Sequence, residues 1–114
     1  MKILNIDKKD SIQSKVPIKI LSLDYFIEKN NIQNIDLLKI DTEGYEFNVL
    51  KGMSKYNHLV KLIYFEHHYD DMIIKDYKFG DIHQLLKSYG FKKLKKSKML
   101  FRKSFEYVYE NRKN

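Results

Sequence analysis

The 114-residue sequence contains no cysteine, no tryptophan and no alanine, and it has one proline and four glycines. Without cysteine the chain can form neither disulfides nor thiolate metal sites, and it has no cysteine nucleophile. No apolar run approaches the roughly 20 residues that a membrane span requires, and the first residues lack the apolar core of a secretory signal. We therefore expect a soluble, cytoplasmic protein that does not associate with a membrane.

The composition is that of a folded domain. Hydrophobic residues make up 43% of the chain and aromatic residues 14%, which is enough apolar material for a core. The length suits one domain and is too short for two, and no low-complexity linker interrupts the sequence. We expect a single domain over residues 1–114.

The positive charge is concentrated in residues 87–114, where ten lysines and arginines face only Glu106 and Glu110. A basic hairpin at 91–103 with interleaved aromatic residues could bind RNA or another acidic partner, and this is the alternative function. The simpler interpretation is an edge hairpin protected by solvated lysines. Because Lys outnumbers Arg 20 to 2 and Arg is the better base reader, we favour the second interpretation and do not expect nucleic acid as a partner.

Hydrophobic patterning predicts strands at 16–21, 35–41 and 59–66, and two further strands at about 91–102 and 105–110. Three helices are expected between them. The first helix is capped by Ser22 and has Leu23, Phe26 and Ile27 on one face. The second helix is opened by Gly44 and ended by Gly52, with Tyr45, Val49 and Leu50 inward. The third helix is closed by Gly90 and has one apolar face, formed by Phe79, Ile82, Leu85, Leu86 and Tyr89. This alternation predicts an α/β fold with a mainly parallel sheet and a C-terminal antiparallel hairpin.

Polar residues follow two of these strands at the point where ligands bind in such sheets. Asp41-Thr42-Glu43-Gly44 comes directly after the 35–41 strand. Acidic residues favour a helix N-terminus, and Thr42 or Asp41 can cap it, which would account for Thr42 and Glu43 alone. Capping does not account for Asp41 at the strand end with Glu46 one turn later. We treat this segment as a candidate functional site.

Glu66-His67-His68 follows the next strand and offers a carboxylate and two imidazoles. Adjacent histidines on an extended segment point in opposite directions, and their spacing matches no helical metal-ligand motif. We therefore expect no metal site. The better interpretation is Glu66 at a strand end with His67 as a proton acceptor.

The run IDLLKIDTEGYE at Ile35–Glu46, followed by VLKG and later by LIYFEHH, closely resembles the FkbM-type methyltransferases. The resemblance extends from about residue 16 to about residue 103. It implies a Rossmann-like class I methyltransferase fold and the cofactor S-adenosylmethionine (SAM), with a small-molecule acceptor methylated on a hydroxyl of a sugar or natural product. By resemblance, Asp41, Thr42, Glu43 and Gly44 would bind the cofactor, and Asp41, Glu66 and His67 would be catalytic. Which of these three is the base stays open.

The sequence departs from the family pattern in its first half. No G-x-G turn is present, and we expect the first two strands of the family fold to be absent. In the family strand order 3-2-1-4-5-7-6 these strands separate the third from the fourth. We therefore expect a truncated domain, the C-terminal half, with an unprotected edge on the 35–41 strand. Three arrangements would follow from this truncation. The 16–21 strand could pair directly with the 35–41 strand, or an N-terminal half or a second copy of the chain could supply the missing strands. Alternatively, the chain is the remnant of a split gene. We expect little or no SAM binding by the chain alone.

Overall fold

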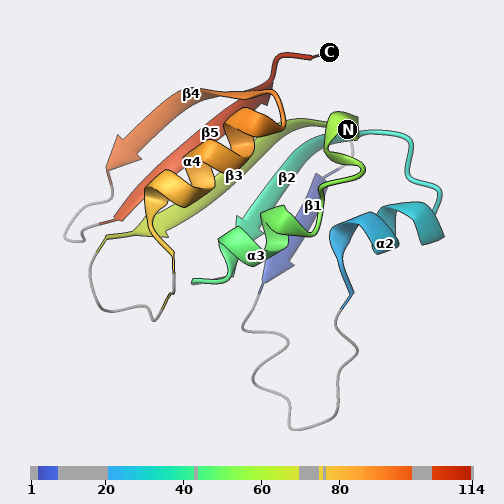
Figure 1. Cartoon of the computed structure of the whole chain (residues 1–114), viewed down its shortest axis with the longest axis horizontal. Coiled ribbons are helices and arrows are strands. Elements are labelled where there is room, and N and C mark those ends of the chain that lie inside the picture. The colour runs from blue at the N-terminus through green and yellow to red at the C-terminus, as the bar shows by residue number, and fades with distance from the viewer. Residues whose placement is uncertain are drawn as a thin grey trace, which may run out of the picture.

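A five-stranded β-sheet forms the centre of the computed structural model, with its strands in the order β1-β2-β3-β5-β4 (Figure 1). The structure describes residues 3–7, as backbone alone, and residues 21–42, 44–69, 75, 77–98 and 104–113. The strands are β1 (Ile3–Asp7), β2 (Ile35–Asp41), β3 (Val60–His68), β4 (Phe91–Lys98) and β5 (Ser104–Asn111). The helices are α2 (Leu23–Lys29), α3 (Glu46–Lys51), α4 (Phe79–Ser88) and the 3-10 helix η1 (Asn57–Leu59).

The sheet is mixed, and not mainly parallel as the sequence predicted. β1, β2 and β3 pair in parallel, whereas β5 pairs antiparallel with both β3 and β4. The predicted antiparallel pairing of the last two strands is confirmed, and β5 lies between β3 and β4. In β4 the register shifts between Lys93 and Lys95, which places a β-bulge at Leu94.

The edge of β2 that we expected to be unprotected is covered by β1. Ile6 lies beside Ile40, and Asp7 lies beside Asp41. The predicted strand at 16–21 falls outside the described residues except for Leu21, which is not in a strand. The partner of β2 is thus the segment Ile3–Asp7, which the sequence analysis did not predict. Parallel pairing with β1 satisfies the backbone groups along this edge of β2.

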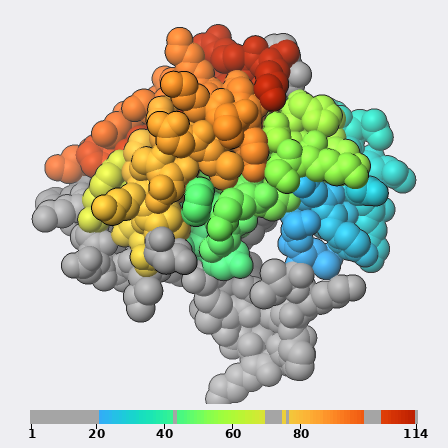
Figure 2. All heavy atoms as spheres, viewed as in Figure 1, coloured from blue at the N-terminus to red at the C-terminus, as the bar shows by residue number. Residues whose placement is uncertain are grey.

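The three α-helices lie on one face of the sheet, and in that view their side chains and those of the α3–β3 connection cover much of the sheet (Figures 1 and 2). Ser22 caps α2 as predicted, since its Oγ accepts a hydrogen bond from the Tyr25 N–H at 3.1 Å. Phe26 is 38% exposed, so the predicted inner face of α2 is wrong at this residue. Helix α3 begins at Glu46, which leaves Tyr45 outside the helix and 39% exposed instead of inward.

Strand alternation divides the sheet residues between two faces. The helix face carries Leu38, Ile40, Ile63, Phe65, His67, Tyr107 and Tyr109, which are all buried. The opposite face carries Leu37, Lys39 and Asp41 from β2, Leu62, Tyr64, Glu66 and His68 from β3, and Ser104, Glu106, Val108 and Glu110 from β5. None of the helices in the described part of the chain lies on this opposite face, and none is long and apolar enough to cross a membrane.

Aromatic rings fill the core between the helix face and α4. Phe65 stacks on Tyr107 and Tyr109 at centroid distances of 5.4 and 5.8 Å, and Phe79 stacks on Tyr107 at 4.3 Å. The Tyr109 hydroxyl lies 2.7 Å from His83 Nδ1, which places His83 at the border of the core. The buried tyrosines thus combine a large apolar area with a polar tip that finds a partner.

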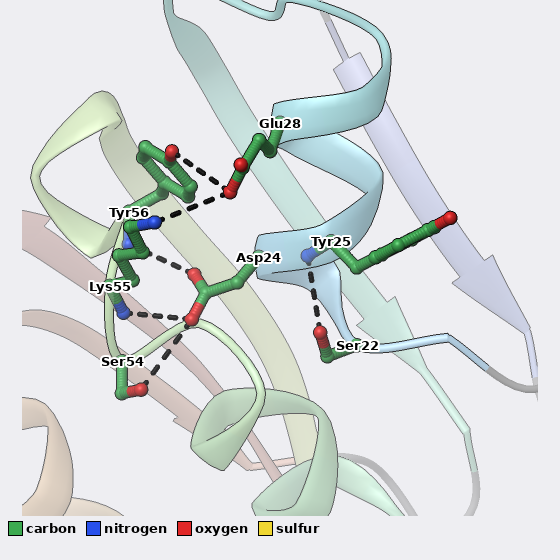
Figure 3. Close-up of polar contacts among 7 residues, drawn as sticks. All are labelled: Ser22, Asp24, Tyr25, Glu28, Ser54, Lys55 and Tyr56. Carbon is green, nitrogen blue, oxygen red and sulfur yellow. Dashed lines mark hydrogen bonds and ion pairs between the residues drawn. The ribbon is translucent and has the colours of Figure 1, made fainter.

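Asp24 joins α2 to the segment that leads into β3 (Figure 3). Its carboxylate accepts hydrogen bonds from the backbone N–H groups of Lys55 at 2.8 Å and Tyr56 at 2.9 Å. Glu28, one turn later, contacts Lys55 Nζ at 3.3 Å and the Tyr56 hydroxyl at 3.2 Å. The two acidic side chains therefore fix the position of α2 beside the α3–β3 connection.

We predict that Asp24→Ala lowers the free energy of unfolding by about 2 kcal/mol, because it removes a charged acceptor from two backbone donors. Urea unfolding of the wild type and the variant measures the difference. Glu28→Gln is the matched control and should lose much less, since Glu28 is exposed and solvent screens its ion pair. Equal losses in the two variants would contradict the special role given to Asp24.

Candidate functional site

The carboxyl ends of β2 and β3 meet at the same edge of the sheet. The register places Ile40 beside Phe65, so the next residues along the two strands, Asp41 and Glu66, are neighbours on the opposite face. Asp41 is exposed, and the Glu66 side chain is 24% exposed. The structure thus brings together two of the three residues that the resemblance implied to be catalytic.

Tyr64 is the residue around which these carboxylates gather. Burial raises the pKa of Tyr64 to about 12, and its hydrogen bond with Glu106 and the nearby charges of Glu66 and Asp41 add to the shift. Lys39 lies over the Tyr64 ring, with its Nζ 5.9 Å from the ring centroid. The opposite face therefore combines carboxylates, one phenol and one ammonium group around the strand ends.

His67 lies on the helix face, away from Asp41 and Glu66. It is 2% exposed, and its ring centroid is 4.7 Å from that of Tyr69, 5.7 Å from that of Phe79 and 5.8 Å from that of Tyr77. Burial lowers the pKa of His67 to about 4, with a smaller contribution from the charge of Lys75. A neutral imidazole in an aromatic pocket is the result, and the sheet separates it from the two carboxylates.

The segment after β2 is organised by Glu46, which the sequence analysis noted but did not place among the site residues. Gly44 has a φ of 108°, a conformation that favours glycine. Its N–H donates to the two carboxylate oxygens of Glu46 at 3.2 and 3.1 Å. The Tyr77 hydroxyl also donates to Glu46, which is 3% exposed. The signal for this arrangement was a glutamate at the first helical position, two residues after a glycine.

The remaining residues that the resemblance assigned to the cofactor are only partly placed. Thr42 is 2% exposed, and its Oγ1 has no hydrogen-bond partner among the described residues. Glu43 lies outside the described residues. Within the described ranges no group of three His, Cys, Asp or Glu side chains could hold a metal ion.

His68 lies on the same face as Glu66, and its role was not predicted. Its Nε2 is 3.1 Å from Glu66 Oε1, within ion-pair distance but not aligned as a hydrogen bond. Ser104 of β5 lies directly beside His68 in the register, and both are buried. Strand alternation predicts that His67 and His68 lie on opposite faces of the sheet. It does not predict which of the two shares a face with the carboxylates and which packs under α4.

The basic hairpin is described as far as Lys98 on β4 and from Ser104 on β5. The lysines of β4 are exposed along the edge of the sheet, and Lys96 Nζ lies 4.3 Å from the Phe105 ring centroid. This arrangement suits solvated lysines on an edge strand. RNA binding by this hairpin stays a prediction.

Comparison with known families decides the assignment. The model of the methyltransferase FkbM domain matches residues 5–93, which is more than half of the chain. The chain belongs to the FkbM methyltransferase domain family. The match begins upstream of the resemblance noted from residue 16 and includes most of β1, all of β2 and β3, and both candidate strand ends. No curated protein and no solved structure matches the chain. Membership in the FkbM family supports methyltransferase activity as the class of function.

We predict that His67 makes the domain less stable in acid. Its pKa of about 4 in the folded chain lies below the ordinary value of 6.5, so the unfolded chain binds this proton more readily. Stability is therefore highest above pH 6.5 and falls as the pH drops toward 4, by roughly 3 kcal/mol at most. Urea unfolding between pH 4 and 7 measures this loss.

The variant His67→Phe removes the titrating group and should flatten that pH dependence, since its ring suits the surrounding aromatic residues. His58→Gln, at an exposed position in η1, is the control and should keep the wild-type dependence. A variant His67→Phe that loses stability in acid as steeply as the wild type would show that other groups cause the effect.

Proposed function

We propose that this chain acts in SAM-dependent O-methylation, with Asp41 and Glu66 facing a hydroxyl acceptor such as a sugar or a related natural product. The observation that carries the proposal is the pairing register, which sets these two carboxylates side by side at the carboxyl ends of β2 and β3. Ligands of open α/β sheets bind at this end of the strands. Membership in the FkbM methyltransferase family gives the reaction class.

We also propose that the sheet is the corresponding part of a Rossmann-like class I fold. The order β1-β2-β3-β5-β4 corresponds to 1-4-5-7-6 of the class I order, with β1 in the place of the first strand. β5 is inserted antiparallel between β3 and β4, so β4 runs in the same direction as β3. This insertion supports the class I assignment more strongly than the parallel pairs do, because parallel β-α-β units occur in many α/β folds.

The residues of this chain suit the charged sulfur of SAM better than its nucleoside part. When bound, SAM supplies a methyl group on a positively charged sulfur. The exposed carboxylate of Asp41 and the partly exposed carboxylate of Glu66 suit such a charge. By contrast, the Gly44 N–H is already bonded to Glu46, and the sequence has no glycine before Gly44. A glycine turn after β1, which would allow close approach of the cofactor, cannot form.

This chain would therefore hold the acceptor and orient it, while the nucleoside side of the cofactor site is completed by another polypeptide or by a second copy of the chain. The carboxylates contribute alignment of the acceptor and negative charge beside the hydroxyl that loses its proton.

We predict that the 114 residues alone bind SAM weakly or not at all. Isothermal titration calorimetry and a thermal melt with and without SAM measure this, because only a ligand that binds the folded state raises the melting temperature. Saturable binding in the micromolar range, with a melt that rises with SAM, would contradict the prediction.

We predict further that Asp41→Asn and Glu66→Gln each reduce methyl transfer to a hydroxyl acceptor. The residue that assists proton removal should lower the rate by about 10²-fold or more, and the other should have a smaller effect. Transfer of a radiolabelled methyl group at high SAM concentration measures the rates. Glu110→Gln is the control, since Glu110 lies on the same face beside Leu62, far along the strand from Glu66. Unchanged transfer in both site variants would contradict the proposed roles.

A further inference from the structure

Buried polar atoms without partners gather at one edge of the sheet. Among the described residues, these atoms are Thr42 Oγ1, Glu66 Oε1, His67 Nδ1, His68 Nδ1 and Ser104 Oγ. All belong to the carboxyl ends of β2 and β3 or to the start of β5. Buried polar side chains elsewhere are bonded: Asn57 Nδ2 donates to the Ser54 carbonyl at 2.8 Å, and Asn111 Nδ2 donates to the Val60 carbonyl at 3.0 Å.

These atoms are available to hydrogen-bond to a ligand at this edge. A buried polar atom without a hydrogen bond costs about 1–3 kcal/mol, so such atoms are rare in folded proteins. Here they coincide with the strand ends where open α/β sheets bind their ligands.

Three of the residues face the same side of the sheet. Glu66 and His68 are two positions apart on β3, and Ser104 lies directly beside His68 on β5. His68 is 6% exposed, and Ser104 is fully buried. The Nε2 of His68 is 3.1 Å from Glu66 Oε1, which is within ion-pair distance, and Nδ1 has no hydrogen-bond partner among the described residues.

We propose that His68 accepts the proton of the acceptor hydroxyl, and that Glu66 holds the imidazole in position for it. The inference rests on the proposed function, and it assigns to His68 the role that the sequence suggested for His67. An imidazole whose second nitrogen faces a carboxylate within ion-pair distance is one arrangement that activates a nucleophile. Ser104 lies beside His68 in the register, and its Oγ would hydrogen-bond to the same hydroxyl.

The proton balance is simple. The hydroxyl O–H bond breaks and an N–H bond forms at His68 Nδ1, which gives an imidazolium beside the Glu66 carboxylate. The electron pair of the oxygen forms the new bond to the methyl carbon, and the pair of the broken carbon–sulfur bond stays on the sulfur of the methyl donor.

The charges that face His68 suit this role. On its own strand it contacts Glu66; on β5, Glu106 lies beside Glu66; on β2, Asp41 lies beside Glu66. Tyr64, two positions before Glu66, bonds with Glu106. Three carboxylates therefore share the face on which the imidazolium would form. His67, by contrast, is enclosed by aromatic rings on the helix face.

The protonation state of the His68 ring tests the proposal without SAM. Long-range ¹H–¹⁵N spectra of the complete labelled chain report the tautomer of each of its four histidines, and single His→Gln variants assign the signals. We expect His68 to carry its proton on Nε2, toward Glu66, with Nδ1 as an acceptor. Myo-inositol, methyl β-glucoside and glycerol are then added as hydroxyl probes, and at least one should shift Nδ1 of His68 saturably while His58 stays unchanged.

Each result of this experiment either supports or contradicts the role proposed for His68. A proton on Nδ1 would overturn the proposal, because that nitrogen could not accept another. An Nε2–H tautomer with no response to any of the three probes would also overturn it and leave His68 a structural residue. A saturable shift confined to His68 supports it. Because SAM is absent, weak SAM binding cannot produce either negative result.

Two serine variants separate a binding role from general destabilisation. Ser104→Ala should weaken the binding of the responding probe about fivefold, which corresponds to one neutral hydrogen bond. Ser88→Ala removes a hydroxyl from the exposed end of α4 and is the matched control, which should leave the binding unchanged. Unchanged binding in Ser104→Ala would remove Ser104 from the site.

Discussion

The parallel pairing of β2 with β3 is the constraint on which both the core and the candidate site depend. Ile40 beside Phe65 directs both side chains toward the helices, and the next residue pair along the strands, Asp41 and Glu66, then faces the other way. A shift of one residue in either strand would send its apolar residues to the wrong face. The burial of Ile40 and Phe65 therefore also specifies the position of the two carboxylates.

Neighbouring residues at the end of β3 have unlike environments for the same reason. His67 is enclosed by Tyr69, Tyr77 and Phe79, whereas His68 contacts a carboxylate on the opposite face. The two imidazoles have the same intrinsic chemistry. What separates them is the direction in which each leaves the strand, and hence whether burial among aromatic rings or contact with a charge dominates.

Much of the architecture could be predicted from local patterns. The apolar run at 35–41, the cap at Ser22 and the stop at Gly90 each depend on residues close in sequence, and the structure confirms them. Features set by distant residues were less accessible. No local signal pairs Ile3–Asp7 with β2 or joins Asp24 to the backbone of Tyr56. In the site, the strand ends could be predicted because carboxylates follow apolar runs. The face of the sheet on which each side chain lies could be assigned only from the pairing register.

The position of β5 has a consequence for the order in which the chain can fold. β5 follows β4 in sequence, yet it pairs with β3 on one side and with β4 on the other. While the chain is being synthesised, the β3 edge that will receive β5 has no native partner until residues 104–111 have emerged. Until then β4 also lacks its native partner, because it pairs with β5. The apolar strand that ends in the candidate site is thus the one most exposed to wrong pairing during synthesis, until β5 has been made and pairs with it.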